Sequence, residues 1–421
     1  MRVTPGDVFI PGGLPEATYV SREHLRIEGS LNDWLCTRQK PLLSVSGPTK
    51  SGKTVLLKKS IQNGIWLSGG AIDTAEDFWE AICEELEVFT DHAISGSYSR
   101  VANGQATLGG DPLGSVSAGA ERDMTREIAR ARSGTARSAA RKALKQNRDK
   151  IVVIDDFHYI NSNEQVSIVH GLKDLIFDGL GVVVAAVPHR AYDVVRVEKE
   201  MTGRVETLSV EDWDSNDLRL IGLQGFEALG VEISEAILDR LVAESFTSPH
   251  LMQTHCLQLC RANSTDGGLN PSLQAPDWKR FFERQASATS KTAFDLLKTG
   301  PRTRTDRAIR HLKDGTNTDI YGLVLAAIEK TGPKTSVTYD EIRASLRDIL
   351  ESELPQRHEI TNVLGQMTKI AKESIEGEPV LDYDEEYSTL HLVDPYFAYY
   401  LRWASPAMKD IAVHRPSDEL S

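Results

Sequence analysis

The sequence predicts an α/β fold, in which a parallel β-sheet with helices on both faces is followed by a helical segment and a C-terminal winged helix. Short apolar segments alternate with helical patterns up to Val210, which is typical of a doubly wound parallel sheet. After Val210 the strand patterns stop and helical patterns follow one another. The range 321–403 then shows the order helix, helix, helix, strand pair, helix, which is that of a winged helix.

Five strands are predicted for the sheet. The run Ile151–Ile154 consists of β-branched residues and ends in two aspartates, as expected of a strand that is buried on both faces. The other four strands are also short and apolar. They cover Pro41–Ser46, Gly64–Ser68, Gly181–Val187 and Val205–Val210.

Helices are predicted between these strands. Thr74 and Asp77 have the spacing of a capping box, so we expect a helix over Thr74–Leu86 with Thr74 as its N-cap. The other helices of the sheet domain are predicted over Lys53–Ile61, Asn161–Phe177 and Arg190–Glu200.

A helical lid and a winged helix are predicted after the sheet. The range 263–276 between them is a polar linker with Gly and Pro, and two further helices are expected before Gly315. The lid helices are predicted over Ser215–Leu229, Ser234–Glu244 and Ser248–Ala262. The winged helix is predicted as helices over Tyr321–Lys330, Tyr339–Leu350 and Glu359–Glu373, strands over Val380–Tyr383 and Thr389–Leu392, and an apolar helix over Val393–Trp403.

The composition excludes several classes of protein. The chain has 421 residues, of which 40% are hydrophobic and 26% charged, so chain-wide disorder and a fibrous chain are excluded. No apolar run approaches the roughly 20 residues that span a bilayer, and the N-terminus lacks the pattern of a signal peptide, so no membrane span is predicted. Four cysteines favour a reducing compartment, and we expect a cytoplasmic protein.

Positive charge is concentrated in one part of an acidic chain. The formal net charge is −13, which taken alone argues against a nucleic-acid coat protein. The range 121–150 nevertheless holds ten Lys or Arg and four Asp or Glu, and is predicted as a basic helix. The preceding range 94–120 contains six glycines, so we expect a flexible loop or a protruding β-hairpin inserted into the sheet domain.

A phosphate-binding loop follows the first strand. It matches the pattern G-x-x-x-x-G-K-[ST], and the strand before it and the helix after it supply the context that the motif requires. Glycines let backbone N–H groups turn toward phosphates, while Lys53 is expected to reach the β- and γ-phosphates and Thr54 to ligate Mg²⁺. The motif predicts binding of ATP with Mg²⁺. The predicted contacts are Gly47, Pro48, Thr49, Lys50, Ser51, Gly52, Lys53 and Thr54.

Two aspartates follow the strand over Ile151–Ile154. We expect Asp155 to hold Mg²⁺ through its water shell, and Asp156 to orient or deprotonate the attacking water. A solvated pair of aspartates at a strand end is the alternative. The phosphate loop roughly a hundred residues earlier favours the functional interpretation. His158 is expected to be structural.

With these motifs the sequence resembles the AAA+ and STAND branches of P-loop ATPases, and is similar to their origin-recognition and NB-ARC types. The resemblance implies an ASCE-type sheet, in which the strand over Gly181–Val187 lies between the phosphate-loop strand and the acid-bearing strand. It implies ATP hydrolysis, with Arg190 as sensor of the γ-phosphate. Arg204 follows a glycine as in AAA+ proteins, which implies an arginine finger for a neighbouring subunit, with a surface ion pair as the alternative.

The resemblance also implies a pocket for adenine. Pro249 stands where STAND proteins carry Gly-x-Pro before a lid helix, so it is implied to pack near the base, although Thr247 replaces the glycine. The stretch that begins at Tyr19 resembles the segment that lines the base pocket in such ATPases. Tyr19 and Val20 are therefore implied as adenine contacts.

These assignments divide the chain into successive parts. An N-terminal segment over 1–40 leads into the nucleotide pocket, and the ATPase core covers 41–212 with the insert and the basic helix. The remaining parts are a helical lid over 213–262, a linker with helices over 263–317, the winged helix over 318–404 and a tail over 405–421.

The favoured function is that of an ATP-hydrolysing switch of the STAND type, whose nucleotide state controls assembly into a homo-oligomer and thereby a partner. No TIR, nuclease or protease domain has room on the chain, so an effector would be a separate protein. A role in bacterial defence or signalling follows from the family resemblance alone. A scaffold that binds nucleotide without hydrolysis is an alternative, against which the two aspartates weigh.

The main alternative is a DNA-engaged AAA+ regulator of the transposition or replication type. DNA would contact the basic range 121–150 and a second basic stretch over 298–313, for which a solvated helix face is the competing interpretation. The third helix of the winged helix, over 357–373, has few of the side chains that read bases, so packing or locking is favoured as its role.

A zinc site at His255, Cys256 and Cys260 is not favoured. No C-x-x-C pair completes a tetrahedral ligand set. Buried free thiols are predicted instead.

Overall fold

The computed structural model describes residues 3–88, 136–187, 203–266, 268–286, 288–301, 307–332, 334–375 and 379–403. The chain divides into two compact units. The sheet unit is drawn from the ranges 21–48 and 52–211. The helical unit is drawn from 1–20, Thr49–Ser51 and 212–421, so it includes the tip of the phosphate loop. The predicted insert over 94–120 and the predicted helix over Arg190–Glu200 lie outside the described residues.

The sheet unit contains a parallel sheet in which the strand order is β2-β3-β4-β1-β5. The predicted α/β fold is therefore confirmed, and so is the predicted place of β4 between β1 and β3. In that order, the phosphate-loop strand and the acid-bearing strand are separated by one strand. The strands are β1 Leu42–Ser46, β2 Gly64–Ser68, β3 Ile151–Asp155, β4 Gly181–Ala186 and β5 Val205–Ser209.

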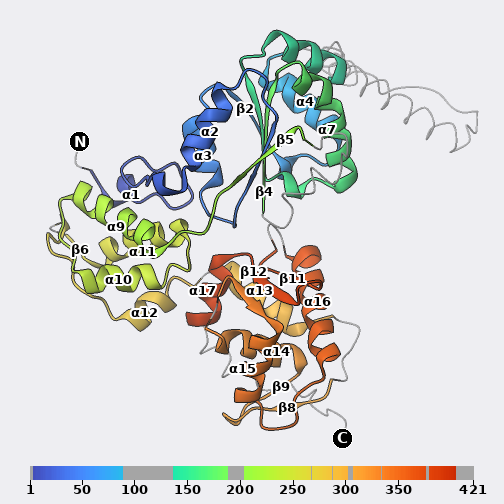
Figure 1. Cartoon of the computed structure of the whole chain (residues 1–421). Helices are drawn as coiled ribbons and strands as arrows, with labels where there is room; N and C mark the ends of the chain where they lie inside the picture. The colour runs from blue at the N-terminus through green and yellow to red at the C-terminus, as the bar shows by residue number, and fades with distance from the viewer. Residues whose placement is uncertain are drawn as a thin grey trace, which may run out of the picture. The chain divides into compact units, whose positions relative to one another are not determined.

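Each face of the sheet is covered by helices because successive side chains of a buried strand point to opposite faces. Leu43 and Val183 face one way and pack with α2 (Ile27–Cys36) and α3 (Lys53–Ser60). Val152 and other residues of alternate parity pack on the opposite face. That face is covered by α4 (Ala75–Glu85), α7 (Ser162–Phe177) and a helix over 136–146 (Figure 1).

The ends of two helices of the sheet unit show why they form where they do. Thr74 caps α4 by accepting a hydrogen bond from the Asp77 amide, and the Asp77 carboxylate accepts one from the Thr74 amide, which confirms the predicted capping box. Helix α2 was not predicted, although Ile27, Leu31 and Trp34 repeat at helical spacing and are buried.

The lid of the helical unit consists of α9 (Ser215–Leu229), α10 (Glu235–Ala243) and α11 (Pro249–Ala262), as predicted. The N-terminal segment, with the short helix α1 (Pro5–Val8), packs on this lid. Phe9 is fully buried there, with its ring centroid 5.1 Å from that of Phe226. Gly225 allows this approach because a Cβ at that position would overlap the Phe9 ring.

The winged helix has the predicted order of elements and one additional strand. Strand β10 (Ser336–Thr338) pairs with β12, and β12 pairs with β11, so the wing is three-stranded. Two helices precede the winged helix: α12 (Trp278–Glu283), which packs in the lid core, and α13 (Ala288–Thr299). The elements of the winged helix are α14 Ile320–Lys330, α15 Tyr339–Ile349, α16 Arg357–Ser374, β11 Leu381–Asp384, β12 Thr389–Leu392 and α17 Pro395–Trp403. Two short hairpins were not predicted, β6 Ser264–Thr265 with β7 Gly268–Leu269 and β8 Arg310–His311 with β9 Asn317–Thr318.

Buried polar contacts connect α17 to the lid inside the helical unit. Glu244 is 1% exposed, and its carboxylate accepts hydrogen bonds from Arg402 and from the Trp403 indole. The Tyr399 hydroxyl donates to the Phe282 carbonyl at 2.8 Å. Because a buried carboxylate needs partners, Glu244 fixes the end of α17. Within the described residues, no helix is long and apolar enough to cross a bilayer.

Candidate functional site

The phosphate loop joins β1 to α3 in a conformation that glycine favours. Gly52 has φ +96° and is the N-cap of α3, and its carbonyl accepts the Leu56 amide at 2.9 Å. Lys50 also adopts a left-handed conformation, with φ +61°. Two left-handed residues in this short segment curl the backbone tightly, as a loop that surrounds a phosphate requires.

The Lys53 ammonium lies inside this loop. Its Nζ donates to the carbonyl of Gly47 at 2.7 Å and to that of Pro48 at 2.8 Å, and the residue is 7% exposed. Burial of a lysine is costly unless its charge has partners. The fold thus holds a cation at the centre of the loop, at the first residue of α3, whose N-terminal dipole also favours an anion.

Two hydroxyls of the loop indicate that a ligand belongs here. Thr49 Oγ1 and Ser51 Oγ are buried, and neither has a hydrogen-bond partner among the described residues. Buried polar atoms are nearly always hydrogen-bonded in native proteins. A ligand that carries several acceptor oxygens, such as a polyphosphate, would satisfy both, so the residues present fit the predicted nucleotide.

The predicted metal ligands lie next to each other in the sheet unit. Asp155 ends β3, and its Oδ2 accepts a hydrogen bond from Thr54 Oγ1 at 2.7 Å. The topology explains this contact, because β1 and β3 flank β4 and their carboxyl ends lie at the same edge of the sheet. A hydroxyl and a carboxylate at this edge are the oxygen donors that Mg²⁺ prefers.

Asp156 is held in a conformation that few residues adopt. Its φ is +54°, in the left-handed region, and it precedes a single 3₁₀ turn over Phe157–Tyr159. Its carbonyl lies against Gly69 at the end of β2, where a Cβ would be 2.8 Å from the Asp156 carbonyl carbon and would overlap its oxygen. Gly69 therefore permits the close approach that fixes the Asp156 backbone.

The tip of the phosphate loop is connected to α17 within the helical unit. The Lys50 ammonium donates to Asp394 Oδ1 at 2.6 Å and lies 4.6 Å from the centroid of the Tyr396 ring. Asp394 also accepts the Tyr396 amide, so it begins α17 as well as pairing with Lys50. A residue of the nucleotide motif is thereby linked to the winged helix.

Tyr396 extends this contact to the start of α11. Its hydroxyl lies 2.7 Å from His250 Nδ1 and 2.9 Å from Thr254 Oγ1. Burial raises the pKa of Tyr396 to about 12, so its hydroxyl stays protonated. Burial and the nearby Lys50 charge lower the pKa of His250, so the imidazole is neutral at physiological pH. Lys50 is thus the cation of this cluster.

The three predicted adenine contacts all belong to the helical unit. Pro249 is the first residue of α11, after the N-cap Ser248. Val20 is buried in the lid core, and Tyr19 is half-buried beside it in the chain. Their contact with a base remains a prediction.

Of the two arginines with a predicted role, Arg190 and Arg204, the structure describes only Arg204. Arg190 lies outside the described residues. Arg204 is exposed, its guanidinium is 5.3 Å from the Phe177 ring centroid, and its carbonyl accepts the Leu42 amide. An exposed side chain can reach a neighbouring subunit, and its role as an arginine finger stays a prediction.

The residues of the discounted zinc site have other partners. The ring nitrogens of His255 bond to Gln285 Oε1 at 2.8 Å and to the Glu244 carbonyl at 3.1 Å. Cys256 and Cys260 are buried free thiols, as predicted, and burial raises the pKa of Cys260 to about 12. A protonated thiol is a poor metal ligand, so this cluster is structural.

The described part of the basic range 121–150 packs on the sheet unit. Arg137 lies 5.7 Å from the Trp79 ring centroid, and Arg141 donates to the Gly171 carbonyl and pairs with Asp174 at 3.2 Å. These arginines are therefore occupied by internal contacts.

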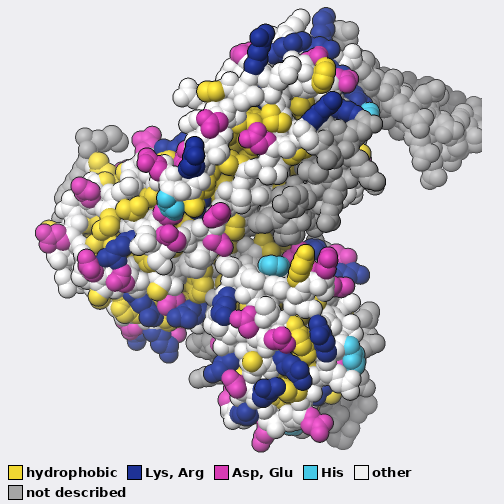
Figure 2. All heavy atoms as spheres, in the orientation of Figure 1, with side chains coloured by type: hydrophobic (Ala, Val, Ile, Leu, Met, Phe, Trp, Pro, Cys, Tyr) yellow, Lys and Arg dark blue, Asp and Glu magenta, His cyan; other side chains and the backbone are white. Residues whose placement is uncertain are grey.

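The described part of the second basic stretch, 298–313, is also engaged. Arg307 donates to Asp319 at 2.6 Å and lies over the Tyr321 ring, and Arg310 pairs with Glu359 at 3.4 Å. On the face drawn in Figure 2, basic side chains of the winged helix are interspersed with acidic ones. The described residues thus favour a structural role for these charges.

Asp394 and Gly69 were not predicted as site residues. Asp394 precedes a proline and Gly69 belongs to a Gly-Gly pair, so each had a signal of local structure only. Their relevance comes from contacts with residues far away in the sequence, which no motif encodes.

Comparisons with known proteins bear on the fold. The sequence matches none of the family models and none of the curated proteins with which it was compared. Its structure is similar to that of the ORC2 protein of Aeropyrum pernix in ADPNP–ADP complexes, with a TM-score of 0.51 and 13% identity over 95% of this chain and 96% of that one. It is also similar to a Walker-type ATPase of Pyrococcus abyssi, with a TM-score of 0.51 and 14% identity over 92% and 99% of the two chains.

These likenesses extend over nearly the whole chain. They confirm the predicted fold class, an α/β parallel sheet of the P-loop NTPase type followed by a C-terminal winged helix. At such low identity they show the fold alone.

Proposed function

We propose that this protein is a Mg²⁺-dependent ATPase that works as a nucleotide-controlled switch, assembling into a homo-oligomer and acting on a separate protein. The observation that carries the proposal is the ion pair between Lys50 of the phosphate loop and Asp394 at the start of α17. Because one partner belongs to the nucleotide-binding loop and the other to the winged helix, this pair can couple nucleotide binding directly to the winged helix.

The site residues would divide the chemistry among them. Bound Mg²⁺-ATP would supply a γ-phosphoryl group for transfer to water. Lys53 holds a positive charge in the loop, while Thr54 and Asp155 present oxygen donors to the metal. Asp156 provides a carboxylate next to Asp155 that can accept a proton from water. A scaffold that only binds nucleotide would not need this second acid.

The switch rests on competition for one cation. Lys50 is the loop residue whose ammonium pairs with Asp394, and a polyphosphate in the loop would attract the same ammonium. Release of Lys50 removes a partner from Asp394 and weakens the hold on α17. A ligand shifts a two-state equilibrium only by its difference in affinity for the states, and this competition provides such a difference.

Assembly gives the proposal a direct test. At a free ATP concentration about a hundredfold above Kd, binding stabilises the state that binds ATP by about 2.7 kcal/mol. Because this state is proposed to assemble, adding ATP and Mg²⁺ is expected to raise the particle mass measured by multi-angle light scattering. Lys53→Ala removes the buried cation and is expected to abolish the increase. A mass that stays constant with ATP would refute the switch.

DNA is a second candidate partner, favoured by the net charge of +6 over 121–150. The same scattering experiment with a duplex added tests it. Binding that appears at low salt and falls steeply as salt rises would support a phosphate-tracking contact. An unchanged mass at low salt would exclude it.

A further inference from the structure

Trp213 forms a buried contact with the phosphate loop from outside the motif. Its indole Nε1 donates to the Ser51 carbonyl at 2.8 Å, and the residue is 9% exposed. Both residues belong to the helical unit. Within the described residues, this hydrogen bond joins the loop to the segment between β5 and α9.

The contact determines how one peptide of the loop is oriented. There are no cis peptide bonds among the described residues, so the Ser51 carbonyl and the Gly52 N–H point in opposite directions. With the carbonyl directed at the indole, the Gly52 N–H is directed away from it. Gly52 has φ +96°, one of several conformations open to a glycine, and the bond to the indole favours the orientation of its peptide seen here.

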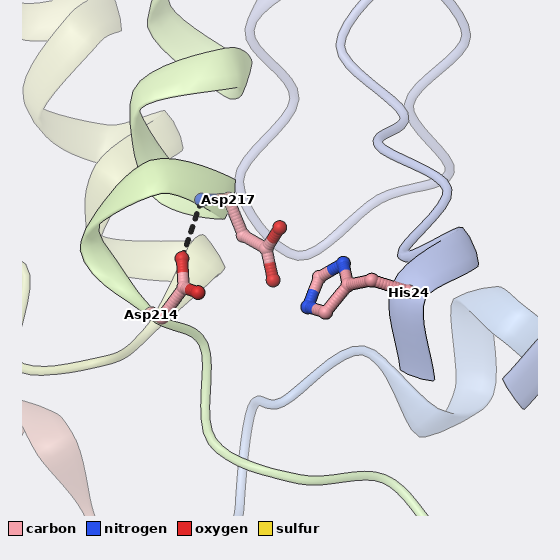
Figure 3. A group of neighbouring side chains, drawn as sticks. All are labelled: His24, Asp214 and Asp217. Carbon is pink, nitrogen blue, oxygen red and sulfur yellow. Dashed lines mark hydrogen bonds between the residues drawn. The ribbon is translucent and has the colours of Figure 1, made fainter. Parts of the chain in front are cut away.

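Trp213 is itself held firmly. Asp214, the next residue, caps α9 by accepting the Asp217 amide at 2.8 Å (Figure 3). The Trp213 ring belongs to the lid core together with Leu218. Because Asp214 caps the helix that follows and the Trp213 ring is packed in the lid core, the indole N–H has little freedom to move.

We infer that Trp213 is a positioning residue that keeps the phosphate loop in the conformation that binds a polyphosphate. The inference rests on the proposed function, since it requires that ATP binds this loop. It places a determinant of nucleotide affinity immediately before the first helix of the lid, outside the sequence motif.

The test compares two tryptophans that lose the same chemical group. Trp213→Phe removes the indole donor at the loop, and Trp34→Phe removes a donor that likewise bonds to a backbone carbonyl, that of Pro41 at 2.9 Å, before β1 begins. Binding of ATP is measured by isothermal titration calorimetry, with kcat and the melting temperature alongside. The Kd for ATP should rise about tenfold in Trp213→Phe, with stoichiometry unchanged and kcat within about twofold. Trp34→Phe should leave the Kd unchanged.

The outcomes separate a local effect from a general loss of structure. A variant that is merely less stable would bind fewer ATP molecules per chain at the same Kd, which would overturn the inference, as would a Trp213→Phe protein that binds as tightly as wild type. If Trp213→Phe does not fold, replacement of Trp213 by benzothienylalanine keeps the ring shape without the N–H. Absence of ATP binding by the wild type would reject the proposed function itself, and the inference with it.

Discussion

The Asp156→Asn variant is expected to hydrolyse ATP about 10²- to 10⁴-fold more slowly than the wild type, the range that general-base catalysis contributes. Asparagine has nearly the same shape and adopts left-handed conformations readily, so the φ of +54° at this position is retained. The variant loses the carboxylate that can accept a proton from water. Because Asp156 is not among the predicted ATP contacts, the Kd for ATP should stay within about threefold of wild type.

Single-turnover hydrolysis and equilibrium binding of ATP check this prediction together. Asp33→Asn, an exposed change on α2, is the control and should leave both quantities unchanged. Hydrolysis at the wild-type rate by Asp156→Asn would show that another group accepts the proton. Loss of ATP binding would instead assign Asp156 to the binding of the nucleotide.

Gly69→Ala is expected to lower hydrolysis about 10²-fold without touching any reacting group, because a displacement of about 1 Å can cost that much. A Cβ at this position would overlap the carbonyl oxygen of Asp156. A backbone carbonyl cannot rotate away as a flexible side chain can. The Asp156 segment must therefore shift, and its carboxylate with it.

The neighbouring glycine provides a matched control. A Cβ at Gly70 would meet only Ser68 Oγ at 3.8 Å and Tyr159 Cδ2 at 3.9 Å, which are ordinary contacts. Gly70→Ala should therefore hydrolyse ATP at the wild-type rate. Equal rates in Gly69→Ala and Gly70→Ala would mean that the close approach at Gly69 does not position Asp156.

The elements that follow from local patterns were predicted well. The bounds of β2 (Gly64–Ser68) and β12 (Thr389–Leu392) agree with the predicted ranges, and Thr74 caps α4 as its spacing to Asp77 indicates. Strand β10 was not predicted because three residues carry too little periodicity. It forms because Val337 pairs with Leu390 on a neighbouring strand, which is a tertiary contact.

The site residues also fall into two groups, those that a local motif predicts and those that depend on tertiary contacts. The phosphate loop could be recognised because its chemistry depends on adjacent residues in a fixed order. Lys50 and Asp394 are 344 residues apart, so their ion pair depends on the fold of the helical unit. Gly69 and Trp213 likewise act through backbone carbonyls, which have the same chemistry at every position and leave no sequence signal.

The central claim is that Asp394 and ATP compete for Lys50, and Asp394→Asn tests it. Asparagine still accepts the Tyr396 amide at the start of α17, so only the charge is removed. The ion pair is partly exposed, with side-chain exposures of 32% and 18%. Because water screens such a pair, we expect it to contribute about 1 kcal/mol to the contact between Lys50 and Asp394. Coupling between two binding events is reciprocal. The free energy by which the ion pair weakens ATP binding therefore equals the free energy by which bound ATP weakens the contact of Lys50 with Asp394.

The decisive measurement is the Kd for ATP of the wild type, of Asp394→Asn and of a control. Asp382→Asn breaks a similar ion pair of the winged helix, with Lys372 at 2.7 Å, and should leave the Kd unchanged. Asp394→Asn should bind ATP about fivefold more tightly than the wild type. An unchanged or weaker affinity in Asp394→Asn would contradict the competition on which the switch depends.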